Sequence, residues 1–246
     1  MHRARRIAAT AALVVAALAA AFSVDVPASA ATATETVRIG TSVQGRPIVA
    51  IHRWAPGATK KVLVIGNLHG DERAGMRVIE RLRTRTVPAD VNLWLIPTLN
   101  PDGNAADTRT NARGVDLNRN FPHSWRYAGR GTSKYSGPRA ASEPETRALM
   151  AFVSKYKPRT TIVFHQPLYG VDSYRAKSMT LVRALSRETG LPVKSFSCSG
   201  VCHGTFTGWH NANTPGRAVT VEFSRPVTTY RLDRTTRAVL RVGSAY

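Results

Sequence analysis

The sequence is poor in cysteine and in acidic residues. Its 246 residues include two cysteines and 15 Asp and Glu against 35 Lys and Arg, a formal net charge of +20. A charge of this size favours anionic partners. The sequence nevertheless lacks both a known nucleic-acid-binding motif and a basic stripe with interleaved aromatic residues, so it does not indicate DNA or RNA. It contains no internal repeat and no sign of a second domain, and its length is that of one ordinary domain.

Long apolar runs are also absent, except at the N-terminus. Residues 7–22 are nearly all Ala, Val and Leu, follow a basic start, and precede the small-x-small pattern Ala28-Ser-Ala30. This combination is typical of a secretory signal peptide. The run is short for a membrane span, and no stop-transfer pattern follows it. We therefore expect a signal peptide at 1–30 and one exported domain at 31–246, with no membrane span after cleavage.

The basic character survives this expected cleavage. Removing residues 1–30 takes away three arginines and one aspartate, which leaves 32 basic residues against 14 acidic ones, or +18. An exported protein with this charge meets anionic wall polymers, membrane surfaces and carboxylate-rich peptides. We expect the protein to be secreted or associated with the cell wall.

The two cysteines, Cys198 and Cys202, lie four positions apart. Export favours a disulfide between them, because disulfides persist in oxidising compartments. An alternative joins them to His203 and His210 in a structural zinc site. That spacing resembles no usual zinc finger, so the disulfide is the prediction.

A first candidate site follows the apolar run at residues 62–65. The run predicts a buried strand, and the segment at 73–82 predicts an amphipathic helix. His69 and Glu72 lie between them, at the end of a strand, where open α/β sheets place ligands. Two histidines and a glutamate form an established catalytic zinc set. The alternative is a helix N-terminus whose dipole favours acids, with an incidental histidine.

The remaining chain predicts further strands and helices in alternation. A strand, helix, strand order indicates parallel strands with right-handed crossovers. Ser142 begins a capping-box pattern, which predicts that it caps the helix after it. The predicted elements are a hairpin at 37–52 turning at residues 44–45, strands at 91–96, 161–164 and 217–223, and helices after residue 142, at 179–189 and at 228–242.

The segment at 100–122 is long and polar, and we read it as a functional loop, because its density of Asn, Asp and Arg with interspersed apolar residues argues against disorder. Arg109, Arg113 and Arg119 suit the bidentate binding of carboxylates. In a chain this basic, however, a single arginine carries little information.

Two later residues repeat the pattern of a polar side chain on a buried strand. His165 ends the strand at 161–164, as His69 follows the strand at 62–65. Glu222 lies between apolar neighbours, where a carboxylate is costly unless it has a partner or a task. A solvent-facing position, or a pairing with Arg225, would also explain it.

Together these motifs resemble the M14 zinc carboxypeptidase family. The motifs that carry the resemblance are His69-x-x-Glu72, Asn100-Pro-Asp-Gly103, Gly114-Val-Asp-Leu-Asn-Arg-Asn-Phe-Pro122, His165 and Glu222. Tyr135-Ser-Gly-Pro138, Ser142-Glu-Pro-Glu-Thr146 and Phe164-His-Gln-Pro167 are most similar to the murein peptide amidase branch, whose enzymes cut cell-wall peptides between γ-D-glutamate and diaminopimelate. The resemblance implies an α/β fold with a mixed, mainly parallel twisted sheet flanked by helices.

The resemblance also implies a metal centre and a base. His69, Glu72 and His165 match the ligands of one zinc ion per chain, with a fourth position left for water. Glu222 matches the general base that takes a proton from that water. Asp116 matches a carboxylate that orients a ligand histidine.

Substrate binding is assigned in the same way. Asn118 and Arg119 match the pair that holds the free carboxylate of the substrate. Arg109 best matches the arginine that polarises the scissile carbonyl, and Arg113 remains an alternative.

One feature departs from the family. The digestive members carry a mobile tyrosine between the third ligand and the base. Tyr169 and Tyr174 lie in that interval in different surroundings, so neither is assigned, and the region is replaced by the loop at 198–202.

We therefore expect a secreted zinc metallopeptidase that hydrolyses a bond next to a free carboxylate, with a cell-wall muropeptide as substrate. A first alternative is a secreted carboxypeptidase acting on ordinary peptides. A second is a non-catalytic wall-binding protein. The presence of all three matched ligands and of Glu222 argues against this second alternative.

Overall fold

The computed structural model describes residues 32–198 and 202–246, so the expected signal peptide lies outside the described residues. The elements in chain order are β1 (Ala33–Thr41), β2 (Pro47–Trp54), β3 (Lys60–Ile65), α1 (Ala74–Leu82), β4 (Val91–Ile96), α2 (Pro101–Ala106), the 3₁₀ helix η1 (Leu117–Arg119), α3 (Pro144–Tyr156), β5 (Thr160–His165), β6 (Gly170–Asp172), α4 (Met179–Thr189), β7 (Val193–Lys194), α5 (Phe206–Asn213), β8 (Arg217–Glu222) and α6 (Thr229–Ala245).

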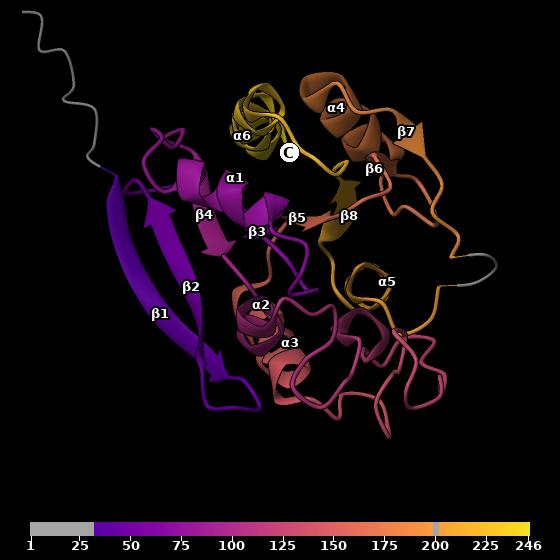
Figure 1. Ribbon diagram of the computed structural model, residues 1–246. Coiled ribbons are helices and arrows are strands. Elements are labelled where there is room, and N and C mark those ends of the chain that lie inside the picture. The colour runs from indigo at the N-terminus through magenta and orange to yellow at the C-terminus, as the bar shows by residue number, and fades with distance from the viewer. Residues whose placement is uncertain (1–31, 199–201) are drawn as a thin grey trace, which may run out of the picture.

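The strands form one mixed sheet in the order β1-β2-β4-β3-β5-β8-β6-β7 (Figure 1). At its centre β3 is parallel to β4 and β5, and β5 is parallel to β8. The hairpin of β1 and β2 joins β4 in antiparallel fashion, and β6 is antiparallel to β8. The expected fold class, a mixed and mainly parallel sheet flanked by helices, is confirmed.

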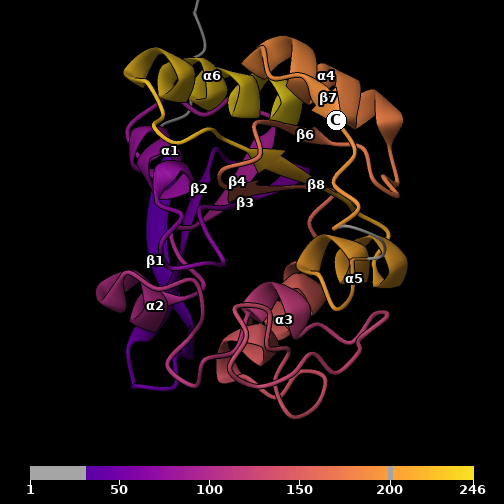
Figure 2. The same ribbon diagram turned by 45° about the vertical axis from the view of Figure 1, so that its right-hand side comes forward.

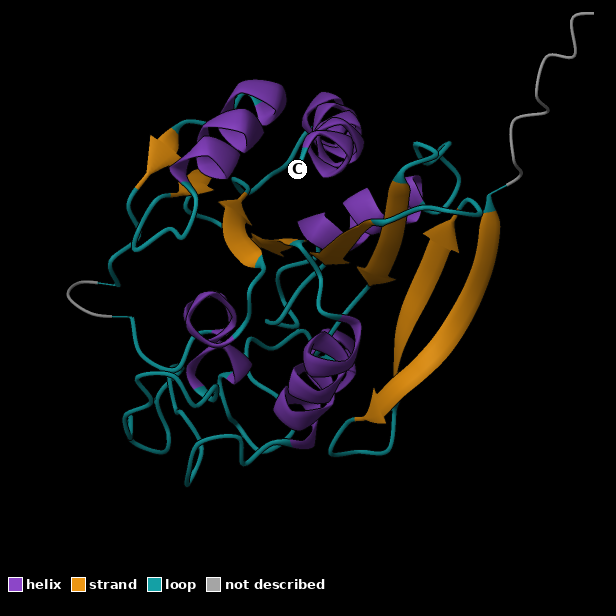
Figure 3. Ribbon diagram, turned by 180° about the vertical axis from the view of Figure 1, so that it is seen from behind, coloured by secondary structure: helices purple, strands orange, loops and turns teal. Residues whose placement is uncertain are grey.

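Helices cover both faces of the sheet (Figures 1 to 3). Helices α1, α4 and α6 lie on one side of it, and α3 and α5 lie on the other. The alternation of side chains along β3 supplies both layers: Val62 and Val64 pack with α1, α4 and α6, whereas Leu63 and Ile65 pack with α3 and α5. Burial on both faces is why this strand reads as a continuous apolar run. Among the described helices, none is both long and apolar enough to cross a membrane.

The structure contains several elements that the sequence predicted. The hairpin turn lies between β1 and β2, β4 spans the predicted residues, and α4 ends at Gly190 in the left-handed conformation that favours glycine.

Three expectations were wrong in detail. The predicted loop at 100–122 contains α2, whose N-cap Asn100 accepts a hydrogen bond from the Gly103 amide at 2.9 Å. The glycine-rich region at 198–215, expected to form a loop, contains α5, whose buried residues are Phe206, Trp209 and His210. Ser142 is not a helix cap, because its hydroxyl donates to Glu143 Oε1 at 2.7 Å and Glu143 occupies the N-cap position.

Candidate active site

The candidate site lies at the carboxyl ends of three adjacent parallel strands. His69 follows β3, His165 is the last residue of β5, and Glu222 is the last residue of β8. His165 and Glu222 are direct partners in the β5–β8 register. Residues paired across adjacent strands project to the same face, so this register places the side chains of His165 and Glu222 together at the edge where His69 follows β3.

The turn that carries His69 approaches α2 very closely. A Cβ atom on Gly70 would lie 2.0 Å from the carbonyl carbon of Gly103. Any larger side chain at position 70 would therefore push the turn away from α2. This contact explains why the Asn100-Pro-Asp-Gly103 turn and the His69 motif belong to the same site.

Three potential ligands converge in the buried interior of this edge. The Nδ1 atoms of His69 and His165 are 3.1 Å apart, and the two oxygens of Glu72 lie 2.9 Å and 2.8 Å from them, respectively. All three ligand atoms lie within 4.8 Å of one another. A tetrahedral zinc ion with Zn–N distances of about 2.0–2.1 Å separates two nitrogen ligands by roughly 3.4 Å. The observed donor set and spacing therefore fit zinc.

A fully buried carboxylate orients the first histidine. Asp116 Oδ1 lies 3.0 Å from His69 Nε2, which turns Nδ1 of the same ring toward the cluster. Metal-binding histidines are usually held in this way by a carboxylate. Burial opposes charge on both groups, but attraction to Asp116 and Glu72 raises the pKa of His69 to about 9. Attraction to His69 and Arg109 holds the pKa of Asp116 well below its usual range.

Arg109 is bound between two of these acids. Its Nη2 lies 2.8 Å from Asp116 Oδ2, and its Nη1 lies 3.3 Å from Glu72 Oε1. This double contact fixes the guanidinium at the rim of the metal cluster. A fixed positive charge at that place can stabilise a developing oxyanion.

Glu222 lies beside the cluster without belonging to it. Its Oε2 accepts a hydrogen bond from the Leu168 amide at 3.2 Å, and the residue lines the same cleft as the three ligands. Burial raises the pKa of Glu222. A carboxylate with a raised pKa is a stronger base, as a proton-transferring group requires.

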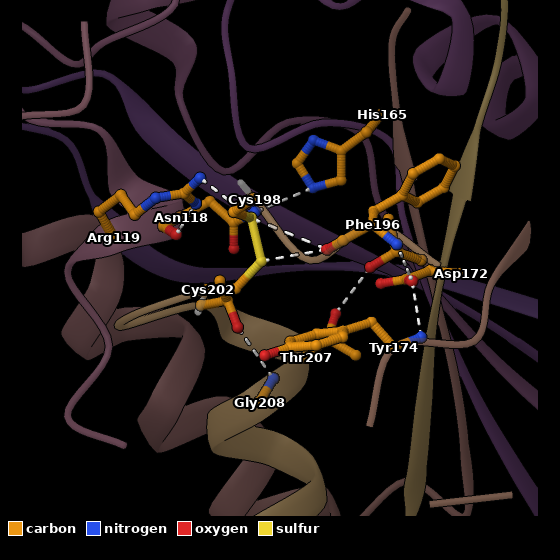
Figure 4. Close-up of a disulfide and its surroundings, with 12 residues drawn as sticks. Asn118, Arg119, His165, Asp172, Tyr174, Phe196, Cys198, Cys202, Thr207 and Gly208 are labelled. Atoms are coloured by element: carbon orange, nitrogen blue, oxygen red, sulfur yellow. Dashed lines mark hydrogen bonds between the residues drawn. A yellow bond between two sulfur atoms is a disulfide. The ribbon is translucent and has the colours of Figure 1, made fainter. Parts of the chain in front are cut away.

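Asn118 and Arg119 form the adjoining wall of the cleft (Figure 4). The side-chain nitrogen of Asn118 lies 3.5 Å from His165 Nε2, and its side-chain oxygen accepts a hydrogen bond from the backbone amide of Phe206 at the start of α5. The Arg119 guanidinium donates to the Asn118 carbonyl and lies 3.6 Å from Cys198 Sγ. Among the described residues it has no carboxylate partner, so it can bind one from a substrate.

The structure contains the disulfide between Cys198 and Cys202, and both cysteines line the cleft. The alternative zinc site is therefore absent from the described residues. His210 is buried elsewhere and makes contacts of 3.1 Å and 3.2 Å with the hydroxyls of Thr161 and Thr214.

Arg113 is not brought together with the other predicted residues. It lines a separate depression, and its Nη1 lies 3.6 Å from the buried carboxylate of Glu143. The tight turn at 111–115 directs it away from the cleft, whereas Arg109 reaches Glu72. Of the two arginines considered for the scissile carbonyl, only Arg109 lies at the metal cluster.

Several residues of the cleft carried no sequence signal. The cleft has a volume of about 440 Å³, and it is lined by Asp172 at the end of β6 and by Tyr174 and Lys177 in the segment after this strand. Only Gln166 had a recognisable context, directly after His165. Its amide oxygen accepts from the Ala74 amide and its Nε2 donates to the Ser224 carbonyl, which ties three site segments together.

Comparisons with known proteins point to one family. A family model described as "Zinc carboxypeptidase" matches residues 20–169, more than half of the chain. Murein peptide amidase A of Escherichia coli (strain K12) is 33% identical over 156 residues, which cover 57% of this chain and 62% of that protein. The catalytic chain of carboxypeptidase N from Rattus norvegicus is 31% identical over 162 residues, covering 49% and 35%, respectively. The chain thus spans about three fifths of the first relative and a third of the second.

Solved structures extend the likeness to most of the fold. The crystal structure of murein-tripeptide amidase from Escherichia coli O157 superimposes with a TM-score of 0.67 at 26% identity, covering 85% of this chain and 90% of that one. Carboxypeptidase A from Helicoverpa armigera gives a TM-score of 0.71 at 17% identity, covering 86% and 68%, which shows the shared fold.

Proposed function

This chain belongs to the zinc carboxypeptidase family, and from that premise we propose that it is an exported, zinc-dependent hydrolase of cell-wall peptides. The bond cleaved is the amide between γ-D-glutamate and diaminopimelate, next to a free carboxylate. The observation that carries the proposal is the arrangement of the cleft. Glu222 lies beside the His69–Glu72–His165 cluster, and Arg119, an arginine without a described carboxylate partner, lines the same cleft.

His69, Glu72 and His165 would hold the zinc ion, which when bound polarises a carbonyl oxygen and lowers the pKa of water. Asp116 keeps the His69 ring turned toward the cluster. Glu222 accepts a proton from the attacking water and then passes a proton to the leaving amine. Glu222 pairs with His165 in the β5–β8 register, which gives its carboxylate access to both the attacking water and the leaving amine.

Arg119 and Asn118 bind the free carboxylate of the leaving residue, and Arg109 stabilises the negative charge that develops on the carbonyl oxygen. Binding the carboxylate on one side of the cluster fixes which amide bond lies beside Glu222. The enzyme therefore cleaves the bond adjacent to a free carboxylate.

The wall substrate is supported by three observations. The relatives include murein peptide amidases. The N-terminal segment has the pattern of a signal peptide, which would bring the protein to the wall. The charge of +18 from residue 31 onward attracts carboxylate-rich peptides and anionic wall polymers.

The test is the release of diaminopimelate from L-Ala-γ-D-Glu-diaminopimelate by the purified, zinc-loaded protein. N-benzoyl dipeptides ending in Phe or Arg are the comparison substrates. We expect kcat/KM to be higher for the wall peptide by about tenfold or more, and the activity to vanish with a chelator and return with zinc.

Two other results would replace the proposal. Cleavage of the dipeptides alone would identify a carboxypeptidase for ordinary peptides, which the similarity to carboxypeptidase N favours as second candidate. Zinc binding without cleavage of any peptide, together with retention on isolated cell walls, would identify a wall-binding protein.

A further inference from the structure

Two neighbouring helices on one face of the sheet are strongly basic. Helices α4 and α6 together carry six arginines and two acidic residues, which are Arg183, Arg187, Arg231, Arg234, Arg237 and Arg241 against Glu188 and Asp233. On the other face, α5 contains no Asp, Glu, Lys or Arg, and α3 contains one acidic and two basic residues. The pair of α4 and α6 thus has a net charge of +4, far above that of either helix on the opposite face.

These two helices lie side by side (Figures 1 and 2). They run antiparallel, because the Tyr246 hydroxyl after α6 donates to the Thr180 carbonyl at the start of α4, at 3.2 Å. At the other end, Arg231 in the first turn of α6 donates to the Thr189 carbonyl at the end of α4. The apolar side chains of both helices pack inward on the sheet, so the two helices present one continuous outer surface.

Guanidinium groups from both helices meet on this surface around a single carboxylate. Arg187 Nε lies 3.5 Å from Glu188 Oε1, and Arg241 Nη1 lies 3.2 Å from Glu188 Oε2. Arg234 donates to the carbonyls of Glu188 and Arg187 at 2.9 Å and 3.0 Å. One carboxylate therefore faces two guanidiniums, and Arg234 has no carboxylate partner among the described residues.

Two more arginines of this surface are free of partners. Arg183 lies one turn before Arg187 on α4, and Arg237 lies between Arg234 and Arg241 along α6. Both are exposed. Neither side chain forms a hydrogen bond or an ion pair with any described residue. Their charges are therefore available to a ligand.

A structural role explains only part of this charge. A helix C-terminus attracts cations, which accounts for the arginines of α6 that bind the last carbonyls of α4. It does not account for the unpaired Arg183 and Arg237. Nor is the charge neutralised by the second acid, because Asp233 lies 2.8 Å from Arg81 of α1.

The arrangement fits an extended anion that carries phosphate groups. Residues 234 and 241 are about 10 Å apart along the helix, further than a single phosphate can bridge. Arginine binds phosphate oxygens through two parallel N–H donors. The exposed large apolar side chains of the two helices, Met179 and Tyr230, lie at opposite ends of the pair. The surface therefore offers neither an apolar patch for a membrane nor a row of rings for stacking bases.

We propose that the outer surface of α4 and α6 binds a linear polymer of phosphate groups without bases, through Arg183, Arg187, Arg237 and Arg241. None of these four residues lines the cleft, so the inference goes beyond the proposed function and does not depend on it. In an exported protein, this surface would hold the chain on an anionic wall polymer and leave the cleft free for a peptide.

The test is the titration of the zinc-loaded protein with poly(glycerol phosphate), with glycerol phosphate as the monomer. The polymer is expected to bind about 100-fold more tightly per phosphate than the monomer, because it contacts several arginines at once. Its affinity should fall steeply between about 50 and 200 mM salt. The double variant Arg183→Gln with Arg237→Gln should weaken the polymer about tenfold and reduce the slope of log K against log salt by roughly 1.5.

The matched control removes the same charge elsewhere. Arg126 and Arg139 lie in the segment between η1 and α3, are exposed, and have no side-chain hydrogen bond or ion pair with the described residues. Arg126→Gln with Arg139→Gln should change polymer binding less than about twofold. All four positions lie outside the cleft, so hydrolysis of the wall peptide should be the same in both double variants as in the wild type, and thermal melting confirms that each is folded.

Equal losses in the two double variants, or a polymer that binds no better than the monomer, would overturn the surface. Tighter binding of poly(U), or of vesicles containing phosphatidylglycerol, at equal phosphate concentration would overturn the partner in favour of a nucleic acid or a membrane. Polymer binding at α4 and α6 without hydrolysis of any peptide would leave this inference standing and refute the proposed function. Hydrolysis without polymer binding would do the reverse.

Discussion

The two ends of the cleft are built in different ways. At the metal end, His69, Glu72 and His165 are 2–4% exposed and lie at or just beyond the ends of parallel strands in the centre of the sheet. At the other end, Asp172 ends the short strand β6, and Tyr174 and the exposed Lys177 belong to the segment that follows this strand. Strand ends are fixed by the packing of the whole sheet, whereas a connecting segment can change without disturbing the core. We therefore expect the central strands to hold the candidate metal ligands in place and the connecting segments to determine the contacts with the substrate.

This difference predicts how variants at the two ends should behave. Changes at the metal end should act on kcat, whatever the substrate. Changes at the substrate end should act on selected substrates and leave the metal in place.

Removing both histidines should have the largest effect. In the variant His69→Ala with His165→Ala, Glu72 alone cannot form the three-residue site, so zinc is expected to fall from one per chain to none and hydrolysis to disappear. Metal analysis after dialysis and an assay with wall peptide measure the two quantities. Full zinc occupancy in the double variant would show that the metal binds elsewhere.

Glu222→Gln should separate chemistry from metal binding. The amide has the same shape but cannot accept the proton, so kcat should fall by about 10² to 10⁴ while zinc remains bound. The measurements are kcat on the wall peptide and the zinc content of the same sample. A kcat within threefold (roughly 0.65 kcal/mol) of the wild type would assign the base to another group.

The metal end could be predicted from the sequence because its signals are local and rigid. His69 and His165 each follow a short, buried apolar run, and parallel strands of one sheet bring such positions to one edge. The central strands, the hairpin and α4 were predictable for the same reason, since their apolar patterns and turn residues agree with the final packing.

The substrate end could not be predicted in this way. Helix α5 begins in a glycine-containing sequence that resembles a loop, and its N-cap Thr205 gives little signal of its own. The place of Lys177 depends on its contact with the Thr214 carbonyl, 37 positions further along the chain. The sequence favoured Arg109 over Arg113 only through a loose match to the family, and the fold of the segment between them brings Arg109 to Glu72 and Arg113 to Glu143.

Arg119→Ala should have a moderate effect that depends on the substrate. Losing a charge-assisted contact with the substrate carboxylate costs about 1.5–3 kcal/mol, or roughly 10- to 100-fold in kcat/KM. Amidation of that carboxylate should harm the wild type to a similar degree and the variant little, because the same contact can be lost only once. Zinc content should be unchanged.

Arg113→Ala is the matched control for this experiment. Its side chain is 55% exposed and lies outside the cleft, so kcat/KM should stay within about twofold of the wild type. Full, additive losses from amidation and from Arg119→Ala would instead give Arg119 a structural role and leave the substrate carboxylate with another partner.

The smallest effect on turnover is expected from the disulfide, although it lies in the cleft itself. A bridge between residues four positions apart closes a short loop, so the double variant Cys198→Ser with Cys202→Ser should lose about 2 kcal/mol of unfolding free energy. For a domain of this size that corresponds to a fall in Tm of about 4–8 °C. Because Cys198 Sγ contacts the Arg119 guanidinium and not the metal ligands, KM should rise a few-fold, whereas kcat and zinc content should be preserved. Calorimetry, steady-state kinetics and metal analysis on one preparation measure these quantities. A loss of zinc, or a fall in kcat of tenfold (about 1.4 kcal/mol) at unchanged KM, would mean that the connecting segment helps to hold the metal end, and the separation between the two ends of the cleft would not stand.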